Sequence, residues 1–270
     1  MITTLALHDL SSWGKSSLTV VLPLMEAMGI ETAVIPTAVL STQTDGFEHV
    51  LSEDMTRILC SYHDMIQEYG YSFSAVYSGY LSTPEQVDDV ISIMEKEDGI
   101  KLVDPVFGDD GMIYSTLSER HIDRIRDLVK IADIITPNIT EATRLSGLEM
   151  KESYSNRDIH LVVEKLEEIG PKEGVVTGVP LLNEVIGNIA YSGDDVRIIS
   201  YEDLYGTFPG GGDAFATILL GSILRGYSFF SAAKTAGDLV FETMKNARCE
   251  HREYRLGIPL YRLIRRLGEY

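Results

Sequence analysis

Residues 2–36, ITTLALHDLSSWGKSSLTVVLPLMEAMGIETAVIP, carry the clearest pattern of secondary structure in the chain. Its apolar run Ile2–Leu7 predicts a strand, and Thr32–Pro36 predicts a second one. Between them, apolar residues recur at helical spacing over Ser16–Met28, and Gly29 is a typical helix end. A strand, a helix and a strand in this order are the repeating unit of a parallel sheet, because parallel strands need a crossover connection.

The same alternation continues toward the C-terminus. Further helices are predicted at Glu53–Tyr69, Pro84–Glu97, Ser118–Ile131, Asn156–Ile169, Gly211–Arg225, Phe229–Lys245 and in a basic segment that ends near Leu267. Further strands are predicted at Ala75–Ser78, Ile100–Val103, Ile134–Thr136 and Gly174–Thr177. Residues 183–201 predict an antiparallel hairpin that turns at Ser192–Asp195. We therefore expect one α/β domain over residues 1–270, with a mostly parallel central sheet and helices on both faces.

Charge and composition narrow the class of protein. With 44% hydrophobic and 24% charged residues, the 270-residue chain is an ordinary globular one. It has 23 basic and 41 acidic residues, a net charge of −18, which disfavours nucleic acid and anionic membranes as partners. Such a charge also repels phosphate, so any bound phosphate must be held locally, although solubility alone is a sufficient reason for the charge.

The sequence predicts a cytoplasmic protein that crosses no membrane. Cys60 and Cys249 lie far apart without zinc-site spacing, as is usual in a reducing compartment. The longest apolar stretch, Ala214–Leu224, holds eleven residues, short of the ~20 that a membrane span needs. The first ten residues lack the basic region of a signal peptide.

A glycine-rich loop is the sharpest functional feature of the sequence. Gly210, Gly211 and Gly212 precede Asp213 and an apolar helix. Glycines let the backbone approach a ligand closely, and a helix N-terminus adds its positive end, so this loop suits a phosphoryl group. Asp213 has two readings that the residues alone leave open: a cap of the helix, or a general base that takes a proton from an attacking hydroxyl.

Acidic residues follow other predicted strands. Asp104 ends a strand, and Asp109 and Asp110 follow on the next loop; these carboxylates suit a hard cation such as Mg²⁺, or simply a polar turn. Asn138 and Glu141 follow another strand, where Glu141 also suits the start of a helix. Because the carboxyl ends of parallel strands meet at one edge of a sheet, these loops together predict a cleft for phosphate and metal.

The loop after the first strand is a candidate for substrate contacts. It carries Asp9, Ser11 and Ser12, and either serine also suits a helix cap. The run Gly14-Lys15-Ser16 is not a nucleotide P-loop, because the glycine that the P-loop needs five residues earlier is replaced by Asp9.

The six histidines show no metal-ligand spacing. His8 and His49 flank the loops that are expected to form the pocket. The other four are expected at the surface: His63, His121, His160 and His251.

Six blocks in a fixed order resemble the pyridoxal kinase family of the ribokinase-like superfamily. They are HDLSSWGKSSLTVVLP (8–23), LSTQTDGF (40–47), YSGYL (77–81), VDPVFGDDGMIYS (103–115), ITPNITEA (135–142) and FPGGGDAFA (208–216). The resemblance implies a three-layer Rossmann-like fold, a homodimer, and transfer of the ATP γ-phosphate to the 5′-hydroxymethyl of pyridoxal, pyridoxine or pyridoxamine. It also implies Mg²⁺ and, as in many members, K⁺.

The resemblance assigns roles to residues in the matching blocks. Asp213 matches the catalytic base, and Gly210, Gly211 and Gly212 match the anion hole. Asp104 and Glu141 match the acidic positions that organise Mg²⁺. The positions around the ATP phosphates are Asp109, Tyr114, Asn138 and Thr177. The positions in the substrate pocket are Asp9, Ser11, Thr44 and Tyr80.

The match has two departures and leaves two alternatives. Gly211 stands where the family usually has threonine, and Gly178 stands where a hydroxyl residue is common. A hydroxymethylpyrimidine kinase of thiamine synthesis shares the fold, and its pyrimidine would stack on Tyr80 as a pyridine does. A non-catalytic vitamin-binding protein on this fold is the other alternative, although a binder has no need of a base at Asp213.

Overall fold

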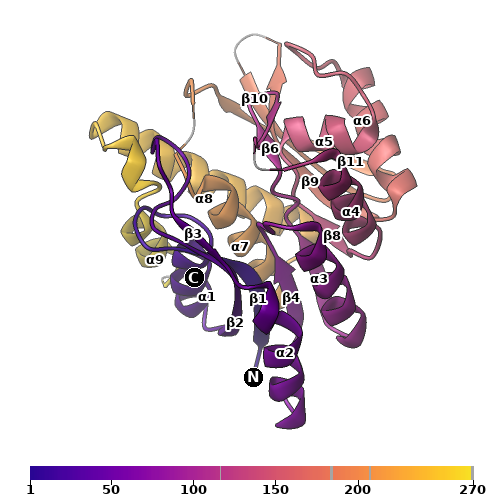
Figure 1. The fold of residues 1–270 in the computed structure, drawn as a ribbon. Coiled ribbons are helices and arrows are strands. Elements are labelled where there is room, and N and C mark those ends of the chain that lie inside the picture. The colour runs from indigo at the N-terminus through magenta and orange to yellow at the C-terminus, as the bar shows by residue number, and fades with distance from the viewer. Residues whose placement is uncertain (116, 183–184, 207, 269–270) are drawn as a thin grey trace.

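One sheet runs through the computed structural model, which describes residues 1–115, 117–182, 185–206 and 208–268. Its nine strands among these residues lie in the order β11-β10-β9-β8-β5-β4-β1-β2-β3 (Figure 1). They are β1 (Thr3–Ser11), β2 (Glu31–Leu40), β3 (Ser52–Asp54), β4 (Ala75–Ser78), β5 (Ile100–Val103), β8 (Ile134–Ile135), β9 (Glu173–Leu181), β10 (Val185–Ser192) and β11 (Asp195–Glu202). Every pairing from β2 through to β9 is parallel, whereas β3, β10 and β11 pair antiparallel. The predicted mixed sheet is confirmed.

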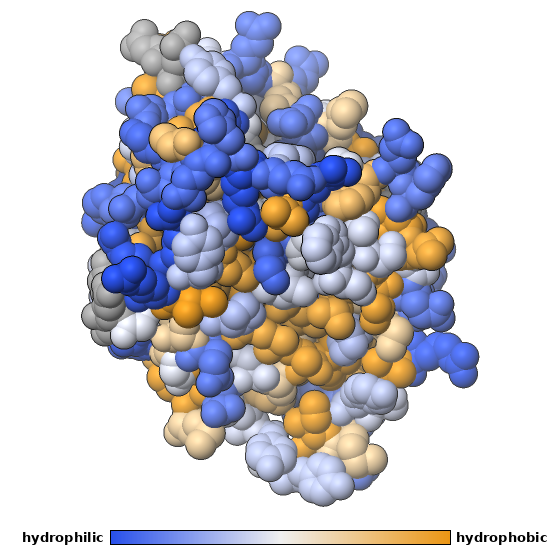
Figure 2. Space-filling model, turned by 90° about the vertical axis from the view of Figure 1, so that its left-hand side faces the viewer, coloured by the Kyte–Doolittle hydropathy of each residue, from blue (hydrophilic) through white to orange (hydrophobic). Residues whose placement is uncertain are grey.

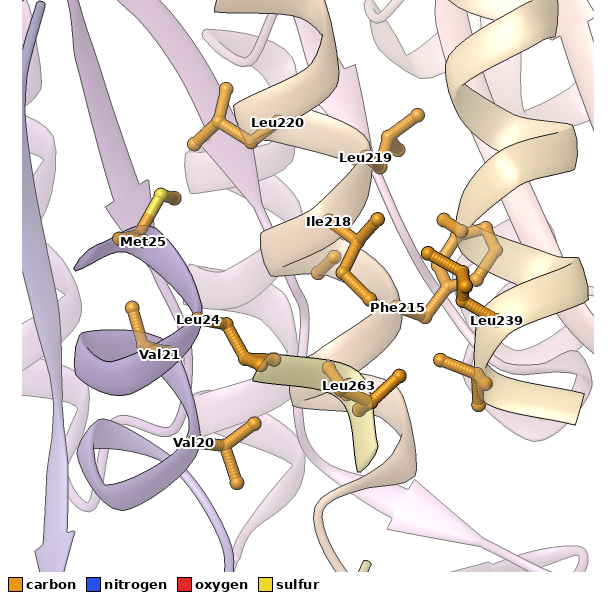
Figure 3. Packing of buried hydrophobic residues seen from close by; sticks show 14 of the residues in the cluster. Val20, Val21, Leu24, Met25, Phe215, Ile218, Leu219, Leu220, Leu239 and Leu263 are labelled. Atoms are coloured by element: carbon orange, nitrogen blue, oxygen red, sulfur yellow. The ribbon is translucent and has the colours of Figure 1, made fainter. Parts of the chain in front are cut away.

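Helices cover both faces of the sheet, and each face has its own hydrophobic core. One layer consists of α1 (Leu18–Ala27), α7 (Gly211–Leu224), α8 (Phe229–Cys249) and α9 (Leu260–Leu267). The other contains α2 (Leu59–Glu68), α3 (Pro84–Lys96), α4 (Glu119–Lys130), α5 (Ile139–Ser146) and α6 (Asn156–Ile169). Figure 3 shows the first core, where side chains of α1 such as Leu24 meet Ile218 of α7 and Leu263 of α9. The central helix α7 is apolar all round because it is buried on nearly every side.

The helix starts follow local capping chemistry. The side chains of Thr83, Ser118 and Ser155 each accept a hydrogen bond from the amide three residues on, at the starts of α3, α4 and α6. Asn138 and Glu141 form a reciprocal capping box at the start of α5. These caps explain why the predicted helix bounds match the structure to within a residue or two at α3, α4 and α6.

Three predicted segments are corrected by the structure. The helix predicted from Glu53 begins only at Leu59, because Ser52–Asp54 pairs with the end of β2 and a 3₁₀ turn, Thr56–Ile58, follows. The first strand runs on beyond Leu7 to Ser11, with a register shift between His8 and Leu10. A small hairpin of β6 (Gly108–Asp109) and β7 (Met112–Ile113), which was predicted only as a loop, forms a second sheet.

The predicted antiparallel hairpin is present as β10 and β11, which turn between Ser192 and Asp195. Of the predicted range, residues 183 and 184 lie outside the described residues. Within the described residues, no helix is long and apolar enough to span a bilayer. Figure 2 shows the side of the molecule at the left of Figure 1, where hydrophobic side chains gather in the lower half and hydrophilic ones in the upper half.

Candidate functional site

The candidate site lies at the carboxyl edge of the parallel strands. Asp9 lies near the end of β1, Gly79 directly follows β4, and Asp104 directly follows β5. Glu141 lies in the first turn of α5, which follows β8. Asp213 lies in the first turn of α7, close enough to Asp104 for its charge to raise the pKa of Asp104. It therefore belongs to the same group of acidic residues.

The glycine loop has the backbone shape that an anion site needs. Gly210 is the N-cap of α7 at φ 82°, a left-handed conformation. A Cβ at this position would lie 2.4 Å from the Lys15 carbonyl oxygen, so only glycine fits. At Gly212 nothing lies within 4 Å of the place where a Cβ would be. The Gly211 amide already donates to the Phe208 carbonyl at 3.1 Å, so of the predicted anion-hole glycines Gly211 contributes no free amide. The amides of Gly212 and Asp213, which follow in the first turn of α7, are the donors left for a phosphoryl group.

The Asp213 carboxylate is held by residues outside its own helix. Its Oδ2 accepts a hydrogen bond of 2.9 Å from the Ser17 amide, and its Oδ1 lies 3.2 Å from His8 Nε2. The side chain is 13% exposed, so a ligand at this edge of the sheet can reach it. Because Gly210 is the N-cap, Asp213 is not the cap of α7, and that reading is excluded.

His8 is the buried group that the sequence did not assign to the site. Its ring is 1% exposed and lies between Asp213 and Asp9, with Nδ1 3.3 Å from Asp9 Oδ1. Burial lowers the pKa of His8, but the contacts with Asp213 and Asp9 raise it by more, to about 10. The only signal in the sequence was its place at the end of a strand beside an aspartate, since Asp213 lies far along the chain.

Asp104 and Glu141 form a second buried acidic pair. Burial raises the pKa of Asp104 to about 7, and the charge of Asp213 adds to this effect. Burial and the charge of Asp104 raise the pKa of Glu141 well above its ordinary value. The Glu141 oxygens accept amide hydrogen bonds from Phe107 at 3.0 Å and Asn138 at 2.9 Å. Glu141 therefore both starts a helix and presents a buried carboxylate.

This pair fits a divalent cation in part. Two buried carboxylates that repel each other are stabilised by a cation between them, and carboxylate oxygen is the ligand that Mg²⁺ prefers. Within the described part of the chain, no three His, Cys, Asp or Glu side chains gather into a complete metal site. Water and phosphate oxygens would therefore have to complete the shell around Asp104 and Glu141.

The β6–β7 hairpin is tied to the start of α5. Asn138 Nδ2 donates to the Gly108 carbonyl at 2.7 Å, and Thr140 Oγ1 accepts from the Gly111 amide at 2.9 Å. Asn138, predicted near the ATP phosphates, thus has its side chain engaged in the fold, and it also pairs through the backbone with Thr177. Thr177 is half-buried, and the following Gly178 adopts φ 67°, where glycine avoids strain.

Two other predicted nucleotide residues belong to the same hairpin region. Asp109 is exposed on β6, and partial desolvation together with the charges of Asp110 and Asp45 raises its pKa. Burial raises the pKa of Tyr114, and the charge of Glu141 adds to this effect. Both residues are therefore within electrostatic range of other acidic groups of this region.

The predicted substrate residues are brought together only in part. Asp9 and Ser11 are buried, with the Ser11 hydroxyl donating to Asp9 Oδ2 at 3.4 Å. Tyr80 is half-buried beside His8's neighbour Gly79, and its carbonyl accepts from the Thr37 hydroxyl at 2.8 Å. Thr44 is exposed on the loop after β2.

Two expectations about single residues are wrong. His63 and His121, expected at the surface, are 0% and 2% exposed. His63 of α2 contacts Glu97, at the end of α3, with 2.8 Å between Nε2 and the carboxylate. The sequence pattern does not reveal such a contact between two helices. The sequence also gave no role to Tyr254, whose hydroxyl lies 3.4 Å from Asp45 Oδ2 on the loop after β2.

Comparison with known proteins decides the family. The sequence model for phosphomethylpyrimidine kinase matches residues 22–255. The chain belongs to the phosphomethylpyrimidine kinase family. Its Aquifex aeolicus relative, a hydroxymethylpyrimidine/phosphomethylpyrimidine kinase, is 28% identical over 181 residues, which cover 66% of this chain and 69% of the relative. The pyridoxal kinase PdxY of Histophilus somni is 32% identical over 198 residues and covers 64% of either chain.

Solved structures of phosphomethylpyrimidine and pyridoxal kinases share the fold almost throughout. A Bacteroides thetaiotaomicron protein assigned to the phosphomethylpyrimidine kinases, crystallised with pyridoxal, has a TM-score of 0.93 at 28% identity and covers 98% of this chain and 95% of its own. The pyridoxal kinase of Lactobacillus plantarum has a TM-score of 0.90 at 26% identity, with 99% and 96% covered. The resemblance to the pyridoxal kinase family and the ribokinase-like fold are thus confirmed. The relatives include kinases named for phosphomethylpyrimidine and kinases named for pyridoxal.

Proposed function

We propose that this member of the phosphomethylpyrimidine kinase family transfers the ATP γ-phosphate to the 5′-hydroxymethyl of pyridoxal, pyridoxine or pyridoxamine. The observation that carries the proposal is the place of Asp213: partly exposed in the first turn of α7, directly after the glycine loop and within electrostatic range of the buried Asp104. A general base, an anion hole and a cation site are the parts that phosphoryl transfer to an alcohol needs.

Asp213 is the base in this mechanism. Each oxygen of its carboxylate has one contact, Ser17 N or His8 Nε2, and keeps a lone pair for the hydroxyl proton of the acceptor. As the proton moves to Asp213, the oxygen of the acceptor bonds to the γ-phosphorus and ADP leaves. The amides at Gly212 and Asp213 face the charge on the transferred group.

Asp104 and Glu141 would hold Mg²⁺, which supplies charge neutralisation on the phosphates when bound. Their contribution is to keep two carboxylates buried at the edge of the sheet, where the hairpin amide of Phe107 fixes one Glu141 oxygen. The family's frequent use of K⁺ extends the proposal, and a dependence of turnover on K⁺ over Na⁺ would support it.

The acceptor is proposed from the Bacteroides relative. That protein was crystallised with pyridoxal and superposes on 98% of this chain with a TM-score of 0.93, which favours a B6 vitamer. Hydroxymethylpyrimidine is the second candidate, because the matching family model and the Aquifex relative act, by name, on phosphomethylpyrimidine.

A turnover assay separates these acceptors. Purified protein with ATP, Mg²⁺ and K⁺ is offered pyridoxal, pyridoxine, pyridoxamine and hydroxymethylpyrimidine in separate reactions, and the phosphorylated product is detected directly. A higher kcat/KM for a B6 vitamer supports the proposal, and a higher value for the pyrimidine replaces it with the second candidate. Binding without product from any of the four would favour a non-catalytic vitamin-binding protein.

The proposed enzyme acts in the cytoplasm as a homodimer. Both Cys60 and Cys249 are free thiols, which suits a reducing compartment. The hydrophobic area in the lower half of Figure 2 is the kind of surface that a second copy covers. A mass of about twice the 30.0 kDa chain in light scattering would support the dimer, and a single-chain mass at micromolar concentration would contradict it.

A further inference from the structure

We propose that His8 is a positioning residue for the phosphoryl transfer: as an imidazolium, it holds the Asp213 carboxylate in place and supplies a fixed positive charge beside it. The inference rests on the proposed function, in which Asp213 is the base. No motif of the sequence pointed to this role, and the contacts of the His8 ring carry it.

Both ring nitrogens of His8 face carboxylate oxygens. Nδ1 lies 3.3 Å from Asp9 Oδ1, and Nε2 lies 3.2 Å from Asp213 Oδ1. A neutral imidazole has one N–H and could donate to only one of these oxygens, leaving a lone pair against the other. Nδ1 pairs with Asp9 by a hydrogen bond, whereas Nε2 approaches Asp213 as an ion-pair contact without hydrogen-bond geometry. Two carboxylates within 3.3 Å of one buried ring favour the imidazolium through their charge.

The surrounding structure leaves the ring little freedom. A Cβ on Gly79 would lie 1.8 Å from His8 Nε2, so the glycine of the YSGYL block makes room for the ring. On the same strand–loop segment, the Tyr77 ring meets His8 edge-on, with centroids 5.4 Å apart and planes at 88°. A ring that is fully buried and packed in this way transmits its position to the carboxylate that it contacts.

The groups that face His8 come from four elements and are predominantly acidic. They are Asp9 of β1, Tyr77 of β4, Asp104 after β5 and Asp213 of α7. The contacts that raise the pKa of His8 to about 10 keep it charged throughout the neutral range. In a chain of net charge −18 that receives anionic ATP, this charge offsets part of the repulsion at the base.

His8 acts through Asp213 and does not touch the reacting atoms. It holds Oδ1 while the Ser17 amide holds Oδ2, so the carboxylate keeps one orientation toward the cleft. Loss of the ring should therefore lower kcat and leave the KM values for ATP and acceptor nearly unchanged.

Steady-state kinetics of His8→Gln test the role. We expect kcat to fall roughly 10–100-fold, the range for outer partners that orient a functional ligand, with little change in either KM. Wild-type kcat should also decline as the pH rises toward 10, and His8→Gln should lack this decline. The matched control is His160→Gln, because His160 is exposed on α6. Wild-type kcat and pH profile in a folded His8→Gln protein would overturn the proposal.

Nitrogen-15 NMR of the wild-type protein tests the charge without any substrate or buried substitution. In histidine-labelled protein, both His8 nitrogens should be protonated from pH 7.5 to pH 9, with the resonances assigned by their loss in His8→Gln. A neutral tautomer at pH 7.5 would overturn the inference. If the wild type phosphorylates none of the four acceptors, the proposed function fails, while the NMR result still decides the state of His8.

Discussion

Two pairs of acidic residues at the site are neutralised in different ways. Asp9 and Asp213 have the His8 ring between them, so the chain itself supplies their cation. Glu141 has amide donors, but burial raises the pKa of both Asp104 and Glu141, and the charge of Asp104 raises that of Glu141 further. No side chain among the described residues places a cation between these two carboxylates, so their charge is left for a bound ion. Asp213, beside the cation that the chain supplies, is therefore suited to act as a fixed carboxylate. Asp104 and Glu141, which have no such cation, are suited to receive a metal ion.

The largest effect is expected for substitution of Asp213, the proposed base in the pair that His8 neutralises. Asp213→Asn should lower kcat by ~10²–10⁴-fold, the usual worth of a positioned base, and retain binding of ATP and vitamin. Single-turnover product formation and calorimetric binding measure the two properties. Near wild-type kcat in this variant would remove Asp213 from the role of base.

The second pair is tested by its response to metal. Asp104→Asn should raise the Mg²⁺ concentration needed for half-maximal activity roughly 10–100-fold, because one of two buried carboxylates is lost. Titration of activity with Mg²⁺ at fixed ATP measures this shift. Asp123→Asn is the matched control, since Asp123 is exposed on α4 and should show the wild-type titration curve. An unchanged curve for Asp104→Asn would place the metal elsewhere.

The sequence predicted the two pairs unequally, for a physical reason. Asp104, Glu141 and Asp213 follow strands or start helices, and such positions can be found from local pattern. His8 gains its role from Asp213 and Gly79, which only the folded sheet brings to it. Contacts of that range depend on tertiary packing and leave no periodic signal.

The same distinction holds for the fold. Asn156–Ile169 was predicted to the residue because Ser155 caps it locally. The helix predicted from Glu53 begins only at Leu59, because Ser52–Asp54 still pairs with β2 at the edge of the sheet. The helical spacing of apolar residues does not reveal this pairing. The β6–β7 hairpin was missed because Asn138 and Thr140, some thirty residues away, hold it in place.

A third test compares the stability of the pairs without ligand. Asp9→Asn should lower the free energy of unfolding by about 1–3 kcal/mol, since it removes a buried partner of the charged His8. Asp104→Asn should leave it unchanged or raise it, because it relieves repulsion with Glu141 and Asp213. Urea unfolding in metal-free buffer measures both. Equal destabilisation by the two substitutions would show that the pairs do not differ.

The pH dependence of stability follows from the raised pKa of His8. A histidine whose folded pKa lies near 10, against 6.5 unfolded, stabilises the protein fully below pH 6.5 and loses that contribution as the pH rises through 10. Wild type should therefore lose stability between pH 7 and 10.5, relative to His8→Gln. Thermal unfolding at matched ionic strength measures the two slopes, and parallel slopes would contradict the assignment.

The smallest effect is expected in the glycine loop. Met244 fills the space beside Gly211, whereas the space beside Gly212 is open. A Cβ at Gly211 would lie 2.1 Å from the Met244 methyl group of α8, whereas a Cβ at Gly212 would meet nothing within 4 Å. The Met244 methyl group thus occupies the space that a side chain at Gly211 would need. Because the methyl end of methionine can turn away, Gly211→Ala should cost only about 0.5–1 kcal/mol of stability. Gly212→Ala is the control and should be neutral in urea unfolding; a larger loss there than at Gly211 would mean that backbone freedom, not Met244, dictates glycine in this loop.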